Sequence, residues 1–210
     1  MKYRPNFTII DHPVMQDKIT KIRDTKTNVK EFRELISEIS TLLCYEALRD
    51  APLTKVTGYT PMGPYEGGTL KDYAIVPIYR AGLGMEEGVI HILPNAKVGH
   101  IGMYRDPSTH NPHTYYHKLP AGISGMTVLL LDPMLATGGS ACESAKILKE
   151  HGAKVIKFLC VVSCEVGVER LMKEHSDIKI YSAAHDLELD KNAYIVPGLG
   201  DAGDRIFGTK

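Results

Sequence analysis

The sequence lacks a net charge, because its 25 lysines and arginines balance its 25 aspartates and glutamates. It therefore produces no overall positive field of the kind that attracts nucleic acid or an anionic membrane surface, and any phosphate binding must be local. Cysteine is also scarce: there are four residues, with no Cys-x-x-Cys pair and no spacing typical of a zinc site. We expect these four thiols to be reduced residues of the core.

Long hydrophobic runs are absent as well. No uncharged stretch is long enough to span a bilayer, and the first residues lack the apolar region of a signal peptide. We therefore expect a cytoplasmic protein with no membrane partner. The remaining composition, 43% hydrophobic and 24% charged among 210 residues, is typical of one ordinary globular domain.

The spacing of apolar residues changes along the chain. Helical spacing predicts a short helix near residues 15–23 and a longer one over 28–50 with Asn28 as its N-cap, and prolines and glycines at 61–68 then break the chain. Beyond this break, continuous apolar strands alternate with helices. The predicted strands cover residues 73–79, 98–104, 128–131, 155–162 and 178–183, and the predicted helices cover 84–93, 140–151 and 166–175. This alternation indicates an α/β fold with a parallel sheet covered by helices on both faces.

A long polar segment from Arg105 to Pro120 interrupts the alternation. It contains three prolines, which argue against regular structure, so we predict a flexible loop over residues 106–119. Loops of this length inside a compact domain usually act as lids or binding elements.

The stretch TVLLLDPMLATGGSACES, residues 127–144, changes from an apolar strand to polar residues at Asp132. Thr137, the glycine pair Gly138–Gly139 and Ser140 follow before the next predicted helix. Hydroxyls, close backbone N–H groups and the positive end of a helix dipole form an anion cradle at the carboxyl end of a strand.

No lysine accompanies this cradle, which distinguishes it from the loop of nucleoside triphosphatases. The neighbouring carboxylate of Asp132 suits a phosphorylated sugar, because it can accept hydrogen bonds from ribose hydroxyls. A plain strand-to-helix turn with a serine cap is the alternative interpretation.

Residues 132–140, DPMLATGGS, resemble the phosphoribosyl pyrophosphate motif of the type I phosphoribosyltransferases, in the Asp-Pro form typical of the uracil phosphoribosyltransferases. Three more segments resemble this family in the same order: RAGLGM at 80–85, GMYRD at 102–106 and YIVPGLGDAGDRIFGTK at 194–210. The resemblance implies the type I phosphoribosyltransferase fold, with a mainly parallel twisted sheet in a single domain over residues 1–210. It also implies a small hood made by the N-terminal helical segment and roughly residues 185–210.

The family transfers the phosphoribosyl group of phosphoribosyl pyrophosphate to uracil N1, which gives UMP and pyrophosphate in pyrimidine salvage. By resemblance, the residues that bind phosphoribosyl pyrophosphate are Arg80, Arg105, Asp132, Pro133, Met134, Leu135, Ala136, Thr137, Gly138, Gly139, Ser140 and Asp201. Those that bind uracil are Ile195, Gly200, Asp201 and Ala202, and the implied catalytic residues are Arg105 and Asp201.

The resemblance further implies Mg²⁺ as the cofactor, held mainly by substrate oxygens, since Mg²⁺ prefers phosphate ligands and water to dedicated protein cages. It implies a homo-oligomer, either a dimer or a tetramer, and GTP as an activator. Nucleic acid is not an expected partner.

Three other interpretations compete with this one. A dinucleotide-binding enzyme is disfavoured because Glu87 stands where the third glycine of G-x-G-x-x-G is required. A metal site at His110, His113 and His117 is disfavoured because a polar loop gives these side chains no common face. The third interpretation comes from another class of function: a non-catalytic regulator that senses phosphoribosyl pyrophosphate and binds nucleic acid.

Overall fold

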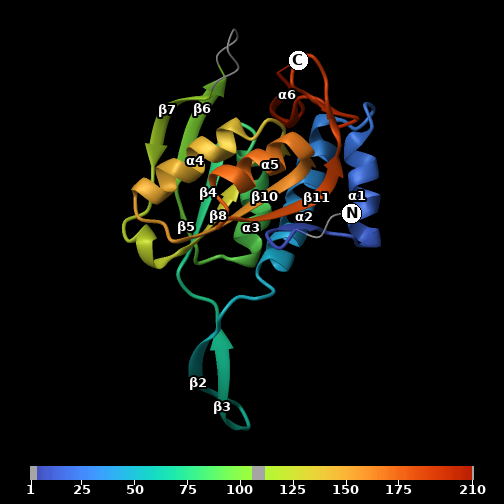
Figure 1. The fold of residues 1–210 in the computed structure, drawn as a ribbon. Coiled ribbons are helices and arrows are strands. Elements are labelled where there is room, and N and C mark those ends of the chain that lie inside the picture. Colours follow the sequence, from blue (N-terminus) through green and yellow to red (C-terminus); the bar gives the residue numbers. More distant parts are fainter. Residues whose placement is uncertain (1–3, 106–111, 210) are drawn as a thin grey trace.

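The computed structural model describes residues 4–105 and 112–209, and a nine-stranded sheet forms its centre (Figure 1). The strands are β1 (Phe7–Ile9), β4 (Tyr73–Tyr79), β5 (Lys97–Val98), β6 (His100–Arg105), β7 (Pro112–Lys118), β8 (Thr127–Leu131), β9 (Met134–Leu135), β10 (Val155–Cys164) and β11 (Lys179–Asp186). Their order is β1-β11-β10-β8-β4-β6-β7, with β5 paired to β4 and β9 paired to β10. All pairings are parallel except that of β6 with β7.

Helices cover both faces of the sheet (Figure 1). Helices α1 (Pro13–Arg23), α2 (Val29–Ala47) and α3 (Leu83–Ile92) lie on one face, and α4 (Gly139–Glu150) and α5 (Glu165–Glu174) lie on the other. Successive residues of β8 enter two different apolar clusters: Leu129 and Leu131 pack with α1 to α3, whereas Val128 and Leu130 pack with α4 and α5. The predicted α/β fold is confirmed.

Helix α2 begins where the sequence predicts. The side-chain oxygen of Asn28 accepts a hydrogen bond from the backbone N–H of Glu31 at 3.0 Å, which satisfies one of the free N–H groups of the first turn. None of the helices in the described part of the chain has the length and apolar character that a membrane crossing requires.

The predicted break at residues 61–68 is instead part of an antiparallel hairpin formed by β2 (Thr54–Thr60) and β3 (Gly63–Thr69). The hairpin projects from the body of the molecule at the end where the strand β4 begins (Figure 1). Gly58 faces Tyr65 across it, and a Cβ at Gly58 would lie only 2.7 Å from the tyrosine ring. The glycines and prolines therefore serve a hairpin rather than end regular structure.

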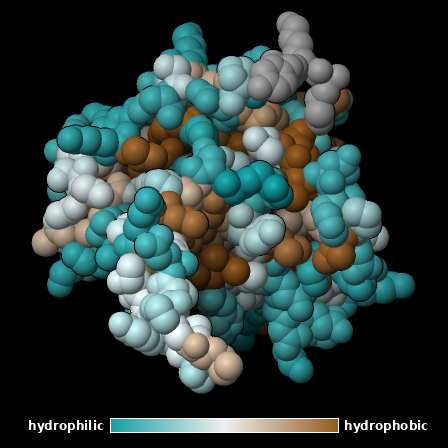
Figure 2. All heavy atoms as spheres, turned by 90° about the horizontal axis from the view of Figure 1, so that it is seen from below, coloured by the Kyte–Doolittle hydropathy of each residue, from teal (hydrophilic) through white to brown (hydrophobic). Residues whose placement is uncertain are grey.

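Figure 2 views the molecule from the hairpin end and shows apolar atoms exposed among hydrophilic ones. Leu53 at the base of the hairpin is 63% exposed and Met62 at its tip is 95% exposed. A cavity of about 370 Å³ lies beside this base and includes Leu53, Leu70 and Leu93.

The predicted irregular loop over residues 106–119 is wrong for its second half, because Pro112–Lys118 forms the edge strand β7, antiparallel to β6. Proline is tolerated as the first residue of an edge strand, and the β-forming Tyr115 and Tyr116 continue the strand. Residues 106–111 lie outside the described residues, so a flexible loop there stays a prediction.

The C-terminal segment folds back over the N-terminal helices (Figure 1). Its short strands β12 (Glu188–Leu189) and β13 (Ile195–Val196) pair antiparallel, and helix α6 (Ala202–Phe207) follows. Ile206 is buried with the α1–α3 cluster, and its carbonyl accepts a hydrogen bond from Arg33 Nε of α2 at 2.6 Å. Both ends of the chain thus contribute to one layer beside the sheet.

An ion cluster fastens the end of α2 to the sheet. Lys157 of β10 is buried and donates to the carbonyl of Ala47 at 2.6 Å and to the carboxylate of Asp50. Lys179 of β11 donates to the same carboxylate. The hydrogen bond from Lys157, followed by that from Lys179, lowers the pKa of Asp50 to about 2.

We expect Asp50→Asn to lower the free energy of unfolding by about 1–2 kcal/mol near neutral pH, because the buried Lys157 loses its counter-charge. The loss is smaller than for a fully buried pair, since the Asp50 side chain is 49% exposed. A depressed pKa stabilises the folded state above the unfolded value of about 3.9, so the difference between the proteins should shrink as the pH falls from there toward 2. Denaturant unfolding across this pH range measures it.

Asp17→Asn is the matched control, because Asp17 pairs with Lys21 on an exposed face of α1. Its effect should stay below about 0.5 kcal/mol. Equal losses in both variants would show that the ion cluster stabilises the fold no more than an exposed ion pair does.

Candidate active site

A cavity of about 480 Å³ lies at the carboxyl edge of the parallel strands. Ala81 after β4 and Asp132, Met134 and Ala136 after β8 line one side, and residues 192–195 and 200–203 of the C-terminal segment line the other. Ligands of open α/β sheets bind at this edge, where loops lead from strands into helices. The fold therefore brings Asp132, Met134 and Ala136 and the predicted uracil segment to one cavity. Thr137, Gly138, Gly139 and Ser140 are not among its lining residues, and Gly139 lines a separate hollow beside α4 and α5.

The loop that carries Asp132 is bound to the centre of the sheet. The carbonyl of Pro133 accepts hydrogen bonds from the backbone N–H groups of Val161 and Val162 of β10, at 2.9 and 3.0 Å. Asp132 Oδ1 accepts the N–H of Met134 at 3.2 Å, which turns the chain after the strand. The carboxylate is thereby placed in the cavity wall.

The predicted cradle residues do not all face the cavity. Met134 and Ala136 line it, but Leu135 is 1% exposed and packs in the α4–α5 cluster. Pro133 is buried, and its carbonyl is engaged with β10. Side-chain contact with a ligand is therefore open to Met134 and Ala136, whereas Leu135 fastens the loop to the core.

Helix α4 starts directly after Gly138, which adopts φ +78°. Its N-cap is a glycine with no side-chain hydrogen bond, so the serine cap of the alternative interpretation is wrong. Ser140 is already inside the helix, and Thr137 precedes the glycines. The first N–H groups of a helix without a side-chain cap are suited to bind an anion, with the positive end of the helix dipole behind them.

Gly167 of α5 packs against the backbone of the cradle loop, and no sequence motif predicts this contact. A Cβ at Gly167 would lie 2.5 Å from the carbonyl oxygen of Ala136 and 2.8 Å from that of Leu135. In turn, a Cβ at Gly138 would lie 2.9 Å from the carbonyl oxygen of Gly167. The two glycines allow helix α5 and the cradle loop to touch through their backbones.

Arg80 follows β4, after a cis peptide bond between Tyr79 and Arg80. Its Nη2 lies 3.3 Å from Asp204 Oδ1 and its guanidinium lies 5.8 Å from the centre of the Phe207 ring. The Arg80 side chain is 56% exposed. Exposed ion pairs stabilise little, so the guanidinium can exchange Asp204 for a phosphate at small cost.

Arg105 is the last residue of β6, and its side chain lies outside the described part of the chain. Its predicted catalytic and phosphate-binding roles stay predictions.

Asp201 forms the N-cap of α6 and lines the cavity. Its Oδ1 accepts the N–H of Asp204 at 2.9 Å, and its Oδ2 accepts the hydroxyl of Tyr194 at 3.3 Å. The other residues predicted to bind uracil, Ile195, Gly200 and Ala202, line the same cavity. Gly200 adopts φ +79°, a conformation that favours glycine.

The cysteines take no part in this site as nucleophiles. All four are free and buried, which confirms them as core thiols. Burial raises the pKa of Cys160, beneath the Asp132 loop, and of Cys142, in α4, to about 12. The thiolate forms that nucleophilic attack requires are therefore disfavoured.

The donor set of the cavity suits Mg²⁺ only as a partner of bound substrate. Asp132 and Asp201 are the acidic side chains among its described lining residues, and two carboxylates leave most of an octahedral shell to other oxygens. Within residues 4–105 and 112–209, the one group of three residues with clustered metal-ligand atoms lies elsewhere, at Cys142, Glu174 and His175.

Two of the three loop histidines, His113 and His117, lie in the described part of the chain. His113 and His117 belong to the strand β7, not to an irregular loop. His113 stacks on Tyr104 with ring centres 5.4 Å apart, and His117 meets His151 edge to face at 5.1 Å. His110 lies outside the described residues.

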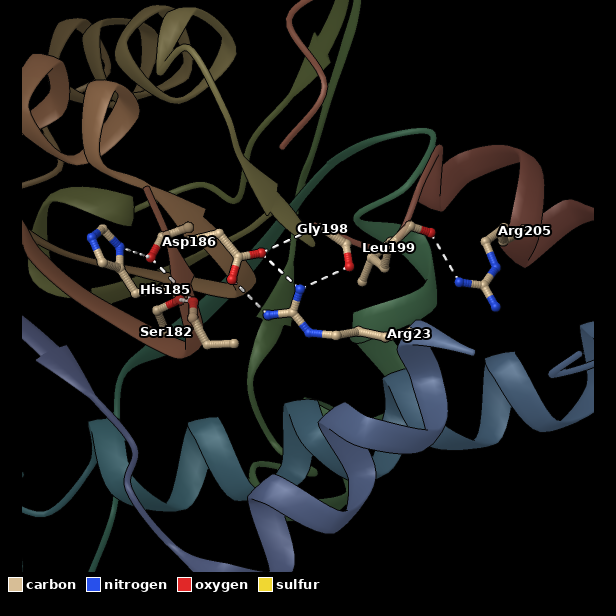
Figure 3. A network of polar contacts seen from close by, with 9 residues as sticks. Arg23, Ser182, His185, Asp186, Gly198, Leu199 and Arg205 are labelled. Carbon is tan, nitrogen blue, oxygen red and sulfur yellow. Dashed lines mark hydrogen bonds and ion pairs between the residues drawn. The ribbon is translucent and has the colours of Figure 1, made fainter. Parts of the chain in front are cut away.

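A polar network that no sequence motif predicts lies behind the C-terminal wall of the cavity (Figure 3). Arg23 at the end of α1 forms an ion pair with Asp186, and both bond to Gly198, while Arg205 bonds to Leu199. Arg23 and Asp186 are far apart in the sequence, so no local motif could reveal the pair.

Comparisons with known proteins agree with this geometry. The sequence model of the family described as uracil phosphoribosyltransferase matches residues 9–209. A uracil phosphoribosyltransferase of Dictyoglomus turgidum is 56% identical over 204 residues, which cover 96% of this chain and 99% of the relative. One of Lysinibacillus sphaericus is 52% identical over 96% of this chain and 98% of its own length. The chain belongs to the uracil phosphoribosyltransferase family.

Solved structures agree with this family's fold. A protein of Aquifex aeolicus has a TM-score of 0.94 and 33% identity, covering 97% of this chain and 99% of its own. An adenine phosphoribosyl transferase of Trypanosoma brucei has a TM-score of 0.61 at 14% identity, over 96% of this chain and 90% of its own, and shows the likeness of fold alone.

For this member of the uracil phosphoribosyltransferase family, we expect Gly167→Ala to lower the free energy of unfolding by about 1–3 kcal/mol. The added methyl would press on the carbonyl groups of Leu135 and Ala136, and backbone atoms at this distance can move only if the cradle loop moves. Denaturant unfolding measures the loss.

Gly125→Ala is the control, since a Cβ there meets no atom within 4 Å. It should change stability by less than about 0.5 kcal/mol. If Gly167→Ala behaved like Gly125→Ala, the close support of the cradle by α5 would be disproved.

Proposed function

We propose that this protein is a uracil phosphoribosyltransferase, a pentosyltransferase that joins uracil N1 to the phosphoribosyl group of phosphoribosyl pyrophosphate and releases pyrophosphate. The observation that carries the proposal is the single cavity between the Asp132 cradle and the Ile195–Ala202 segment. Two similarities support the proposal. The family model matches residues 9–209, and the relative of this name from Dictyoglomus turgidum is 56% identical over nearly the full length of both chains. We propose that the UMP formed serves pyrimidine salvage.

In the proposed complex, the 5′-phosphate lies at the amino end of α4, against the N–H groups around Gly138 and Gly139. The carboxylate of Asp132 then accepts hydrogen bonds from the ribose hydroxyls. Negative charge grows on the pyrophosphate as its bond to the sugar breaks, and Arg80 and Arg105 stabilise that charge. Such groups accelerate the reaction because the charge is largest in the transition state.

Uracil would be recognised by backbone groups. It presents two carbonyl acceptors and an N3–H donor, and Ile195, Gly200 and Ala202 line the cavity, where their backbone groups could pair with this edge. Cytosine reverses the donor and acceptor at this edge, so it would leave buried groups of the site without partners. The site should therefore select uracil.

Several further properties stand as proposals for this chain. Mg²⁺, when bound, would neutralise part of the pyrophosphate charge, and the two cavity carboxylates suit a cation held mainly by substrate. We also propose a homo-oligomer, GTP as an activator, a cytoplasmic location and no nucleic-acid partner, as the family resemblance implies.

The first test is UMP formation from uracil and phosphoribosyl pyrophosphate with Mg²⁺, run beside cytosine, hypoxanthine and orotate. We expect turnover with uracil and a kcat/KM for cytosine lower by about 10⁴-fold or more, the discrimination typical of a site that pairs the edge of its substrate.

Equal use of cytosine would disprove recognition by the 195–202 backbone. Absence of turnover, with phosphoribosyl pyrophosphate still bound and a salt-sensitive RNA complex present, would favour the regulator instead.

We expect Asp201→Asn to lower kcat/KM about a hundredfold, the usual effect of removing a group that accepts or stabilises a proton in the reaction. Asparagine is also a good N-cap, so α6 should keep its start. Steady-state kinetics with uracil measures the loss, and unchanged kinetics would exclude Asp201 from both catalysis and essential binding.

Asp190→Asn serves as the control. The side chain of Asp190 accepts the N–H groups of Asn192 and Tyr194 in the neighbouring turn, and asparagine can accept both. We expect kcat/KM to stay within about twofold of that of the unsubstituted protein.

A further inference from the structure

The C-terminal wall of the cavity is held from behind by a largely buried ion pair. Arg23 donates from Nη1 to one carboxylate oxygen of Asp186 at 2.7 Å and from Nη2 to the other at 2.8 Å (Figure 3). The side chains of Arg23 and Asp186 are 23% and 9% exposed. Bidentate pairing fixes the direction of both groups, and limited contact with water strengthens the bonds.

This pair also holds both backbone polar groups of Gly198. The N–H of Gly198 donates to Asp186 Oδ2 at 3.0 Å, and its carbonyl accepts from Arg23 Nη1 at 2.9 Å. Gly198 adopts φ +53°, and a Cβ there would lie 2.1 Å from the carbonyl oxygen of Ile195. The two peptide groups on either side of Gly198 are therefore fixed in orientation.

A second arginine holds the next carbonyl. Arg205 Nη1 donates to Leu199 O at 2.9 Å and to Ile22 O at 2.7 Å, and its Nη2 donates to Asp24 O at 2.6 Å. Residues 22–24 at the end of α1 are thus tied to two consecutive residues of the C-terminal segment. The next residue along the chain, Gly200, lines the cavity.

We propose that Arg23 and Asp186 are positioning residues for uracil. They are not among the described residues that line the cavity, so they act through Gly198 on the backbone at Gly200 and Ala202. A backbone that pairs with a base must be held to about half an ångström, and a fixed second layer of polar contacts provides this. The proposal rests on the proposed function, and it adds that uracil affinity depends on the end of α1.

The test compares steady-state kinetics of Arg23→Ala, Arg23→Lys and Asp186→Asn with those of the unsubstituted protein. Binding of phosphoribosyl pyrophosphate is measured separately by calorimetry. For Arg23→Ala we expect the KM for uracil to rise about tenfold or more, which is the loss of roughly one buried charged hydrogen bond. Affinity for phosphoribosyl pyrophosphate should fall by a clearly smaller factor, because of its proposed ligands only Asp201 belongs to the C-terminal segment, whereas the Asp132 loop is bonded to β10.

Arg23→Lys keeps the charge but not the fork, so we expect a KM between those of the parent and Arg23→Ala. Asp186→Asn keeps an acceptor for Gly198 and tests the charge of the pair if Arg23→Ala does not fold. Arg4→Ala is the matched control: Arg4 makes another partly buried, long-range ion pair, with Glu165, and in the described part of the chain its side chain forms no hydrogen bond with residues 186–203. It should lower stability and leave the KM for uracil unchanged.

The positioning role would be supported if Arg23→Ala lost affinity for uracil selectively. Arg23→Lys should then restore part of that affinity, and Arg4→Ala should lose none. An unchanged KM in folded Arg23→Ala or Asp186→Asn would overturn it. So would a parallel loss of affinity for both substrates, or the same rise in Arg4→Ala. If the unsubstituted protein forms no UMP, the proposed function itself fails, which the parent assay shows before any variant is compared.

Discussion

Burial of the central strands on both faces is the constraint on which the rest of the structure depends. From Val128 to Leu131 the side chains of β8 alternate between two apolar clusters, so this part of the strand offers no polar side chain to solvent. Polar chemistry can begin only where the strand ends, at Asp132. Because β4 runs parallel to β8, its own end brings Ala81 to the same edge. The cavity therefore lies at the edge of the sheet where the apolar strands end.

The parts of this protein that the sequence predicts well are those with local signals. Continuous apolar runs identify β4, β6, β8, β10 and β11 but not the short strands β1 and β9, and Asn28 marks the start of α2 through a contact three residues away. The cradle is equally local, since Asp132, the glycines and the start of α4 follow one another along the chain. A motif, however, does not show whether a residue would contact a ligand through its backbone or through its side chain. Leu135 belongs to the predicted set of ligand-binding residues, yet its side chain is in the core.

Other parts depend on contacts that the sequence does not display. Glycine and proline at residues 61–68 are signs of a break, and only the pairing of residues 54–60 with 63–69 makes this segment part of a hairpin. Pro112 argues against a strand in the sequence, yet it is the first residue of the edge strand β7, because an edge strand tolerates a residue without an N–H. Gly167 and the Arg23–Asp186 pair support the two walls of the cavity from distant parts of the chain. Their partners are apparent only in three dimensions.

The two walls of the cavity differ in how they are attached. The Asp132 loop is hydrogen-bonded through the carbonyl of Pro133 to β10, so it belongs to the same cooperative unit as the sheet and should open only when that unit unfolds. The opposite wall is joined to the N-terminal helices by the side chains of Arg23 and Arg205 and by burial of Leu199 and Ile206 in their apolar cluster, with no strand pairing to the central sheet among the described residues. Substrate entry and product departure would then proceed by motion of one wall against a stationary one.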